Sequence, residues 1–106
     1  MASSEEVRDH YVEAGGLRFH VREWRGPGRP LVLLHGLAST ARIWDLVAPA
    51  LALHHRVVAY DQRGHGLSDK PDGPYHFDAV CADLPALLAR LDLAAPVLVG
   101  HSWGGN

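Results

Sequence analysis

The chain has 106 residues, 47% of them hydrophobic, so it can form one small domain with an ordinary apolar core. Ten basic and twelve acidic residues leave a net charge of −2, and no basic patch is interleaved with aromatic residues, which argues against nucleic-acid binding. No apolar run reaches the roughly 20 residues of a membrane span, and the first residues lack the pattern of a signal peptide. These features predict a cytoplasmic protein with neither nucleic acid nor membrane as a partner.

Cysteine and histidine usage gives no sign of a metal site. Cys81 is the one cysteine of the chain, so no internal disulfide can form, and we interpret it as a small buried apolar residue in a reducing compartment. Six histidines are scattered without metal-ligand spacing or a convincing carboxylate companion: His10, His20, His54, His55, His65 and His76. We therefore expect no metal and no cofactor.

The amino-terminal part predicts a β-hairpin. A weak strand signal over Tyr11 to Ala14 is followed by Gly15-Gly16, which is typical of a tight turn. Apolar and polar residues then alternate from Leu17 to Arg22, which predicts a strand with one buried face and one exposed face. The stretch from Arg25 to Pro30, rich in glycine and proline, predicts a loop.

Three continuous apolar runs predict strands that are covered on both faces, as in a parallel sheet. They are Leu31–Leu34, Arg56–Tyr60 and Pro96–Val99. A helical segment lies between the first two runs, with apolar residues at Ile43, Trp44, Val47 and Leu51. Pro49 should divide this segment or begin its regular part, because proline is accepted in the first turn of a helix.

A second helix is predicted between the last two runs. Its apolar residues share one stripe: Val80, Leu84, Leu87, Leu88 and Leu91. Asp78 is a plausible N-cap, and Pro85 predicts either a kink or a regular helix that begins close to it. Strands that alternate with helices indicate an α/β fold, with an antiparallel hairpin followed by parallel strands and crossover helices.

The sequence Gly100-His101-Ser102-Trp103-Gly104 follows the last strand directly and has the form Gly-x-Ser-x-Gly. A strand that turns sharply into a helix there would hold the Ser102 hydroxyl exposed, and the flanking glycines remove side chains that would block the turn. Ser102 is thus a candidate nucleophile, with an ordinary turn serine as the alternative.

Two further motifs follow the other two strands. They are His35-Gly36-Leu37-Ala38 and the longer stretch from Asp61 to Asp69, Asp-Gln-Arg-Gly-His-Gly-Leu-Ser-Asp. With the serine motif, these residues make the chain resemble the α/β-hydrolase superfamily from about Tyr11 to Asn106. The resemblance is strongest to the subgroup of small esterases, lactonases, carbon–carbon bond hydrolases, epoxide hydrolases, haloalkane dehalogenases and cofactor-free haloperoxidases. It implies the amino-terminal part of an α/β-hydrolase sheet.

The nucleophile separates the chemistries of that subgroup. Epoxide hydrolases and dehalogenases use an aspartate where this chain has Ser102, and a serine alkoxide is better suited to attack on a carbonyl. The resemblance therefore implies a serine hydrolase that acts on an ester, lactone or similar activated carbonyl through an acyl-enzyme. Two alternatives stay open: a carbon–carbon bond hydrolase or cofactor-free haloperoxidase, and a small-molecule receptor or inactive scaffold with the same fold.

The resemblance also assigns roles at the site. The backbone N–H groups of Leu37 and Trp103 would form the oxyanion hole. Supporting positions are His35, Gly36, Gly100, His101 and Gly104, with His35 orienting the oxyanion loop and His101 packing or hydrogen bonding beside the nucleophile. Asp61 is expected to organise its own loop by accepting backbone N–H bonds, and a catalytic role for it is the alternative. Trp44 could line the substrate pocket or belong to the core.

The length of the chain matters for this interpretation. A complete hydrolase of this type is expected to have roughly 250 residues, with the nucleophile followed in sequence by the acid and the histidine. Residues 1–106 would then be the amino-terminal portion of one domain, with Pro96–Val99 at a bare sheet edge. We expect a second chain to carry the remaining strands, the lid, the acid and the histidine, and the 106-residue chain alone neither to fold stably nor to catalyse.

Overall fold

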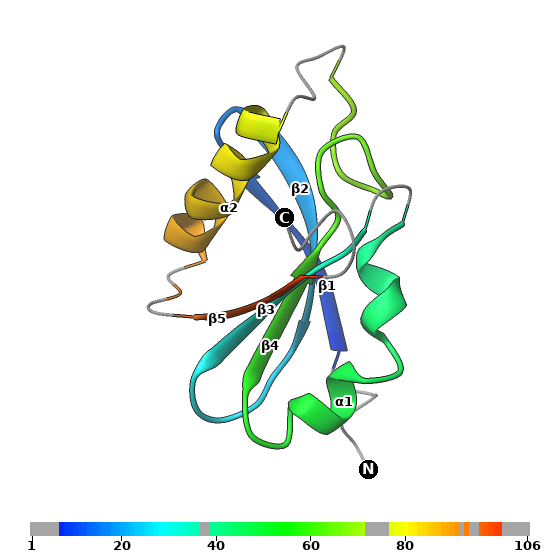
Figure 1. Cartoon of the computed structure of the whole chain (residues 1–106), viewed down its shortest axis with the longest axis vertical. Helices are drawn as coiled ribbons and strands as arrows, with labels where there is room; N and C mark the ends of the chain where they lie inside the picture. The colour runs from blue at the N-terminus through cyan, green and yellow to red at the C-terminus, as the bar shows by residue number, and fades with distance from the viewer. Residues whose placement is uncertain (1–6, 37–38, 72–76, 92, 94–95, 101–106) are drawn as a thin grey trace.

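The computed structural model describes residues 7–36, 39–71, 77–91, 93 and 96–100 (Figure 1). In chain order its elements are β1 (Val7–Ala14), β2 (Leu17–Trp24), β3 (Pro30–Leu34), the 3-10 helix η2 (Ala41–Trp44), α1 (Ala48–Leu51), β4 (Arg56–Tyr60), α2 (Phe77–Arg90) and β5 (Val97–Gly100). The strands predicted from the apolar runs agree with β3, β4 and β5 to within one residue at each end.

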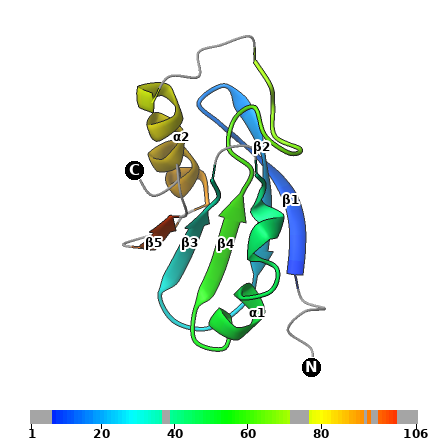
Figure 2. The ribbon, with the colours of Figure 1, turned by 45° about the vertical axis from the view of Figure 1, so that its right-hand side comes forward.

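The five strands of the described part form one sheet in the order β1-β2-β4-β3-β5 (Figure 2). β2 is antiparallel to both β1 and β4, whereas β3 is parallel to β4 and β5. Gly15 and Gly16 join β1 to β2 with φ values of 58° and 84°, a conformation that glycine adopts at little cost. This arrangement confirms the predicted α/β class, an antiparallel hairpin followed by parallel strands.

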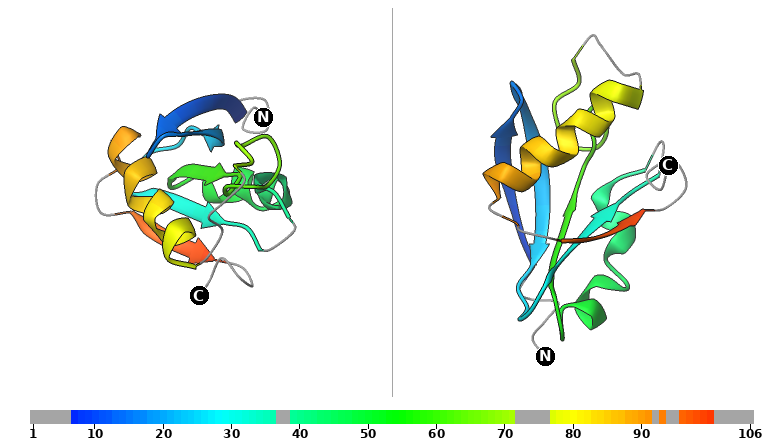
Figure 3. Two further views of the ribbon diagram at one scale, coloured as in Figure 1. Left: turned by 90° about the horizontal axis from the view of Figure 1, so that it is seen from above. Right: turned by 60° about the vertical axis from the view of Figure 1, so that its left-hand side comes forward.

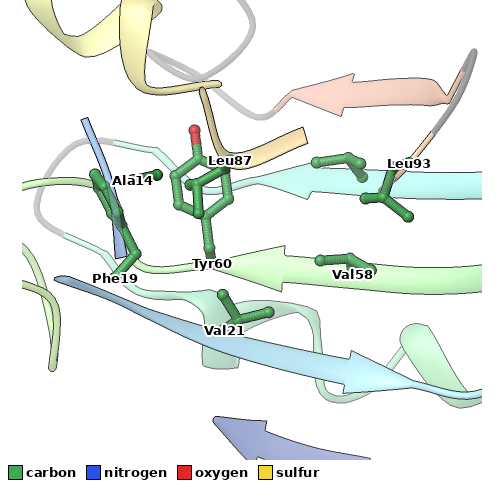
Figure 4. Packing of buried hydrophobic residues seen from close by; sticks show 8 residues of the cluster. Ala14, Phe19, Val21, Val58, Tyr60, Leu87 and Leu93 are labelled. Atoms are coloured by element: carbon green, nitrogen blue, oxygen red, sulfur yellow. The ribbon is translucent and has the colours of Figure 1, made fainter. Parts of the chain in front are cut away.

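Helices cover both faces of the sheet, with α2 on one side and the η2–α1 segment on the other (Figure 3). The apolar residues beneath α2 form a cluster that we call the α2 cluster, and Figure 4 shows its packing. In it, the Phe19 ring meets the Tyr60 ring edge to face at 5.9 Å between centroids. Its buried members are Ala14, Phe19, Val21, Val32, Val58, Tyr60, Leu87 and Leu93.

A second apolar cluster lies on the opposite face of the sheet. Its buried members are Trp24, Leu31, Leu33, Ala41, Ala48, Ala52, Val57 and Ala59. Successive residues of β3 and β4 alternate between the two clusters, because side chains of a strand point to opposite faces. The continuous apolar runs therefore fill two cores at once, as the sequence predicted for these strands.

β2 departs from the expected half-exposed strand. Phe19 and Val21 are fully buried, but His20 and Arg22 on the other face are also only 2% and 8% exposed. The prediction that this polar face meets solvent holds for Arg18 and is wrong for His20 and Arg22, because carboxylates bind these two side chains. β1 likewise begins at Val7, four residues before the predicted strand.

The first helical segment divides as predicted, with Pro49 in the first turn of α1. Its predicted apolar stripe is wrong in part, because Ile43 and Val47 are 44% and 47% exposed while Ala41 and Ala48 are buried. At Ile43 the physical reason is the 3-10 geometry of η2, which has three residues per turn and does not align residues at α-helical spacing. Val47 lies between η2 and α1, as the N-cap of α1, so one continuous stripe cannot include it.

α2 is one continuous helix from Phe77 to Arg90, so Asp78 lies inside it and is not its N-cap. Pro85 also lies inside α2, which excludes a helix that begins there. Pro85 and Cys81 are both on the exposed side, where water can replace the hydrogen bond that proline cannot donate. The exposure of Cys81 corrects its interpretation as a buried residue. Within the described ranges, the helices are too short or too polar to cross a lipid bilayer.

β5 lies at the edge of the sheet, next to β3. Val97, Leu98 and Val99 are 36%, 48% and 37% exposed, although each is a large aliphatic residue. β5 therefore presents an apolar strand that the described part of the chain covers incompletely, as the sequence led us to expect for Pro96–Val99.

Candidate active site

The three strands that lead into the sequence motifs end together, at one edge of the sheet. Because β3, β4 and β5 are parallel, their carboxyl ends lie together, and the register pairs Leu34 with both Tyr60 and Gly100. His35, Asp61 and the segment after Gly100 therefore begin side by side. Ligand sites of open α/β sheets lie at this edge, beyond the carboxyl ends of the strands.

His35 is fully buried and both of its ring nitrogens are engaged. Its Nδ1 lies 2.6 Å from the Gly36 carbonyl oxygen, and its Nε2 accepts the backbone N–H of Gln62 at 2.9 Å. This pattern requires a neutral ring with its hydrogen on Nδ1. Burial lowers the pKa of His35 below its ordinary value, in agreement with a neutral ring.

The His35 ring is therefore unsuited to be a general base. The Nε2 lone pair that would take a proton from a nucleophile already accepts the Gln62 N–H. A second contact binds the same two residues together, because the Gln62 side-chain amide donates to the His35 carbonyl at 2.6 Å. The imidazole thus joins the end of β3 to the loop that follows β4.

The Gly36 carbonyl fixes the start of the turn after β3. Besides the contact with His35, it accepts the backbone N–H of Ser39 at 3.2 Å. Two donors therefore converge on one carbonyl oxygen in a buried position. Leu37, within this turn, lies outside the described residues.

Asp61 organises the loop after β4, as predicted. Its Oδ1 accepts the backbone N–H of Ala41 at 2.7 Å, and its Oδ2 accepts that of Leu67 at 3.0 Å. Gly66 has a φ of 54°, and a Cβ on it would collide with the Asp61 carboxylate. The carboxylate of Asp61 thus holds two backbone segments and its own loop together.

His20 is the functional candidate that sequence reasoning missed. Its ring is 3% exposed and lies between two carboxylates, with Nδ1 2.7 Å from Asp61 Oδ2 and Nε2 2.8 Å from Asp9 Oδ1. The expectation that the histidines lack carboxylate companions is wrong for this residue. The two partners are 41 and 11 residues away in sequence, so no local spacing pattern reveals them.

Arg22 continues this row of charged groups on the same face of β2. It donates to both oxygens of Asp9 at 2.9 and 2.7 Å, and to both oxygens of Asp45 at 2.8 and 3.1 Å. Burial alone would raise the pKa of Asp9, but the hydrogen bonds from Arg22 and His20 outweigh it and lower that pKa. One signal was available: a two-residue turn at Gly15-Gly16 sets Asp9 opposite Arg22 in the hairpin register.

A separate ion pair attaches the same loop to α2. The Arg63 guanidinium forms a fork with Asp83, with Nε and one terminal nitrogen each 2.7 Å from a carboxylate oxygen. The two side chains are 10% and 6% exposed. The loop after β4 is therefore bound to both faces of the sheet, to β2 through Asp61 and to α2 through Arg63.

The structure describes some of the other predicted site residues and not others. Ser102, Trp103, His101, Gly104 and Leu37 lie outside the described residues, and Gly100 is the last residue of β5. Trp44 packs against the second apolar cluster, which favours its interpretation as a core residue. Among the described side chains, His, Cys, Asp and Glu form no group of three placed to hold a metal ion.

Comparisons with known proteins agree with this architecture. Residues 29–106 match the family model described as alpha/beta hydrolase fold. An N-formylmaleamate deformylase of Pseudomonas putida is 42% identical over 96 residues, which are 90% of this chain and 36% of that protein. A non-heme chloroperoxidase of Streptomyces lividans is 41% identical over 94 residues, covering 86% of this chain and 34% of that protein.

The structural comparison gives the same result. The crystal structure of an epoxide hydrolase from Vigna radiata superposes with a TM-score of 0.89 at 33% sequence identity, over 96% of this chain and 34% of that one. The chain thus spans about a third of the length of the relatives it matches. Sheet order, motif positions and sequence identity lead to one assignment: the chain belongs to the α/β-hydrolase fold family.

Proposed function

We propose that this chain supplies the nucleophile and the oxyanion hole of a serine hydrolase that acts on an ester, a lactone or a similar activated carbonyl. The observation that carries the proposal is the register of the parallel strands, which sets Gly100 beside Leu34. Ser102 follows Gly100 by two residues, and the turn at Gly36 follows Leu34 by two residues. The proposed nucleophile and the proposed backbone donors thus follow the ends of two adjacent strands. Attack on a carbonyl requires a nucleophilic hydroxyl close to N–H groups that stabilise the oxyanion.

In this proposal the anchored carbonyl of Gly36 orients the first oxyanion donor. That donor is the backbone N–H of Leu37, the residue that follows Gly36, and the Gly36 carbonyl is bound by His35 and Ser39. The backbone N–H of Trp103 is the second proposed donor. Removal of one such donor typically lowers kcat by about 10²–10³-fold.

The proton-transfer groups of the proposed reaction come from outside this chain. His35 has both nitrogens engaged and Asp61 accepts two backbone N–H groups, so neither is free to serve Ser102. We therefore propose a partner polypeptide that carries a histidine and an acid and completes the sheet. The exposed aliphatic residues of β5 support this proposal, because a further strand could pair there.

The chloroperoxidase relative supports a second candidate function, a cofactor-free haloperoxidase that uses the same serine. Ester hydrolysis and halogenation under peracid-forming conditions, measured on one preparation, separate the two. The epoxide hydrolases among the relatives are less informative about the reaction, because an aspartate is the nucleophile that suits attack on a saturated carbon.

The proposal is tested by covalent labelling of the active protein, in which this chain is combined with the polypeptide that completes the sheet. A fluorophosphonate should label the parent protein on Ser102 and should leave Ser102→Ala unlabelled and without turnover, with an unchanged unfolding midpoint. Heat-denatured parent protein controls for non-specific labelling. Turnover or labelling that survives in Ser102→Ala would refute the assignment of the nucleophile.

The proposed partner has its own test in the isolated 106-residue chain. We expect no cooperative unfolding transition and poorly dispersed amide NMR signals, because β5 leaves apolar residues exposed. Addition of the completing polypeptide should restore both. A cooperative transition in the isolated chain would contradict the need for a partner in folding, while leaving the chemistry of Ser102 untouched.

A further inference from the structure

A row of charged side chains crosses the face of the sheet that is opposite α2. In order of contact it consists of Asp61, His20, Asp9, Arg22 and Asp45, and we call it the charged row. We propose that His20 is a positioning residue, which through this row holds residues 39–45, the backbone that leads out of the proposed oxyanion turn at Gly36. The inference rests on the function proposed above and adds a residue to it.

One end of the charged row holds the beginning of η2. Asp61 Oδ1 accepts the backbone N–H of Ala41, the first residue of η2, at 2.7 Å. Ala41 comes two residues after Ser39, whose N–H binds the Gly36 carbonyl. A shift of Asp61 would therefore move the backbone that leads directly out of the oxyanion turn.

The other end of the row holds the end of η2. Asp45 is the C-cap of this helix, and both of its carboxylate oxygens accept hydrogen bonds from the Arg22 guanidinium. η2 is only four residues long, and such short 3-10 helices have little stability of their own. The charged row thus binds both ends of η2, in addition to the packing of Ala41 and Trp44 against the second apolar cluster.

His20 links the two ends of the row. Its ring lies between the two carboxylates, with Nδ1 2.7 Å from Asp61 and Nε2 2.8 Å from Asp9. Arg22 reaches Asp9 from the other side at 2.7 Å. No other natural side chain presents two opposed nitrogens on a flat ring of this size, so a replacement cannot bridge both carboxylates at these distances.

Hydrogen bonds of its own backbone hold His20 in place. Its backbone N–H donates to the Ser68 hydroxyl at 2.8 Å, and its carbonyl accepts the backbone N–H of Asp61 at 3.0 Å. The side chain of Asp61 is as buried as the ring of His20, each at 3% exposure. Buried ion pairs add little to stability compared with apolar packing, so a role in geometry explains this row better than a role in stability.

The test uses kinetics of the active protein, normalised by titration of Ser102 with a fluorophosphonate to completion. In His20→Gln the kcat per titrated site should fall about 10–100-fold with KM within about twofold, because displacement of catalytic donors by about 1 Å can cost 10²-fold. The matched control is His10→Gln. The His10 side chain pairs with Glu23 at 3.3 Å on the same hairpin, and Glu23 is not a member of the charged row, so the kcat of this variant should stay within twofold.

Asp45→Asn provides a second variant at the exposed end of the row, where the side chain is 35% exposed and folding should persist. We expect its kcat per titrated site to fall about three- to tenfold, because the substitution weakens one of the two hydrogen bonds that Arg22 donates to residue 45. If His20→Gln yields no folded protein, the kcat of Asp45→Asn decides whether the charged row has a positioning role. A purely structural role would lower the number of titratable sites and leave kcat per site unchanged.

Parent-like kcat per titrated site in folded His20→Gln would overturn the proposal, as would parent-like values for Asp45→Asn where His20→Gln does not fold. Failure of the underlying function is seen separately, since Ser102→Ala would then retain turnover. An inactive Ser102→Ala together with a fully active His20→Gln would refute only the positioning role.

Discussion

β2 has buried side chains on both of its faces, but the two faces differ in chemistry. Phe19 and Val21 on one face pack into the α2 cluster, whereas His20 and Arg22 on the other face bind carboxylates. The apolar face gains stability from the area it removes from water, at about 25 cal/mol per Å². The charged face recovers the cost of desolvation through hydrogen bonds of fixed direction, which orient the segments that they bind.

This difference shows how one strand serves two purposes. The apolar face gives non-directional cohesion between the sheet and α2, and a close substitute can replace each of its side chains. The charged face leads from the hairpin to the loops at the carboxyl ends of β3 and β4, where each hydrogen bond depends on one atom of one residue. We expect changes on the first face to alter mainly stability and changes on the second to alter mainly geometry.

The largest expected effect is on the apolar face. Phe19→Ala should lower the free energy of unfolding by about 3–5 kcal/mol, because it deletes a fully buried ring that contacts Tyr60. Denaturant unfolding of the folded protein measures the change. Phe19→Leu should cost less, since it leaves a smaller cavity, and equal losses in the two variants would show that the ring is not packed as described.

On the charged face, Asp61→Asn should lower the free energy of unfolding by less, about 1–3 kcal/mol, because it disrupts at least one of the three contacts of the carboxylate, with His20 Nδ1, Ala41 N–H and Leu67 N–H. The same denaturant titration measures it. In the double variant with His20→Gln, the loss in the free energy of unfolding should be smaller than the sum of the losses in the two single variants, because the two residues share a contact. Strict additivity would indicate that His20 and Asp61 do not interact in solution.

A comparison of two glycines tests the space around Asp61. Gly66→Ala should destabilise the protein about 1–2 kcal/mol more than Gly16→Ala. Both positions have positive φ, but a Cβ on Gly66 meets the Asp61 carboxylate, whereas nothing lies within 4 Å of one on Gly16. Thermal or denaturant unfolding gives the difference. If the two variants are equally stable, the loop after β4 does not close on Asp61 as described.

The smallest expected effect is a pH dependence that comes from His35. Burial lowers the pKa of His35 below the ordinary value of 6.5, so the unfolded chain binds the proton more readily. The stability contribution is therefore complete above pH 6.5 and is lost as the pH falls toward the lower pKa of the folded state. In His35→Gln, whose amide does not titrate, stability should fall less between pH 7.5 and pH 5.5, by up to about 1 kcal/mol.

Denaturant midpoints at several pH values in this range give the slope of stability against pH for the parent protein and for His35→Gln. The comparison needs only the difference between parent and variant, because every other titratable group is the same in both. Equal slopes would mean that His35 does not change its affinity for protons on folding, in conflict with the Gln62 N–H contact at Nε2.

The sequence alone determined the local elements and the positions of the motifs. Continuous aliphatic runs predicted β3 and β4 almost to the residue, because strands with two buried faces need apolar side chains at every position. Gly15-Gly16 predicted the hairpin turn, because both residues need a positive φ there. The three motifs at strand ends indicated one edge of a parallel sheet, and the structure sets His35, Asp61 and Gly100 at that edge.

Tertiary structure alone decided which polar groups meet. His20 pairs with Asp61 across 41 residues, and Arg22 with Asp45 across 23, only because the β2–β4 register and the path of η2 bring them together. Helix periodicity also failed where the backbone adopted 3-10 geometry, which exposed Ile43. Local patterns record the burial and backbone preference of each residue, whereas the choice of a charged partner depends on distances that exist only after the sheet has formed.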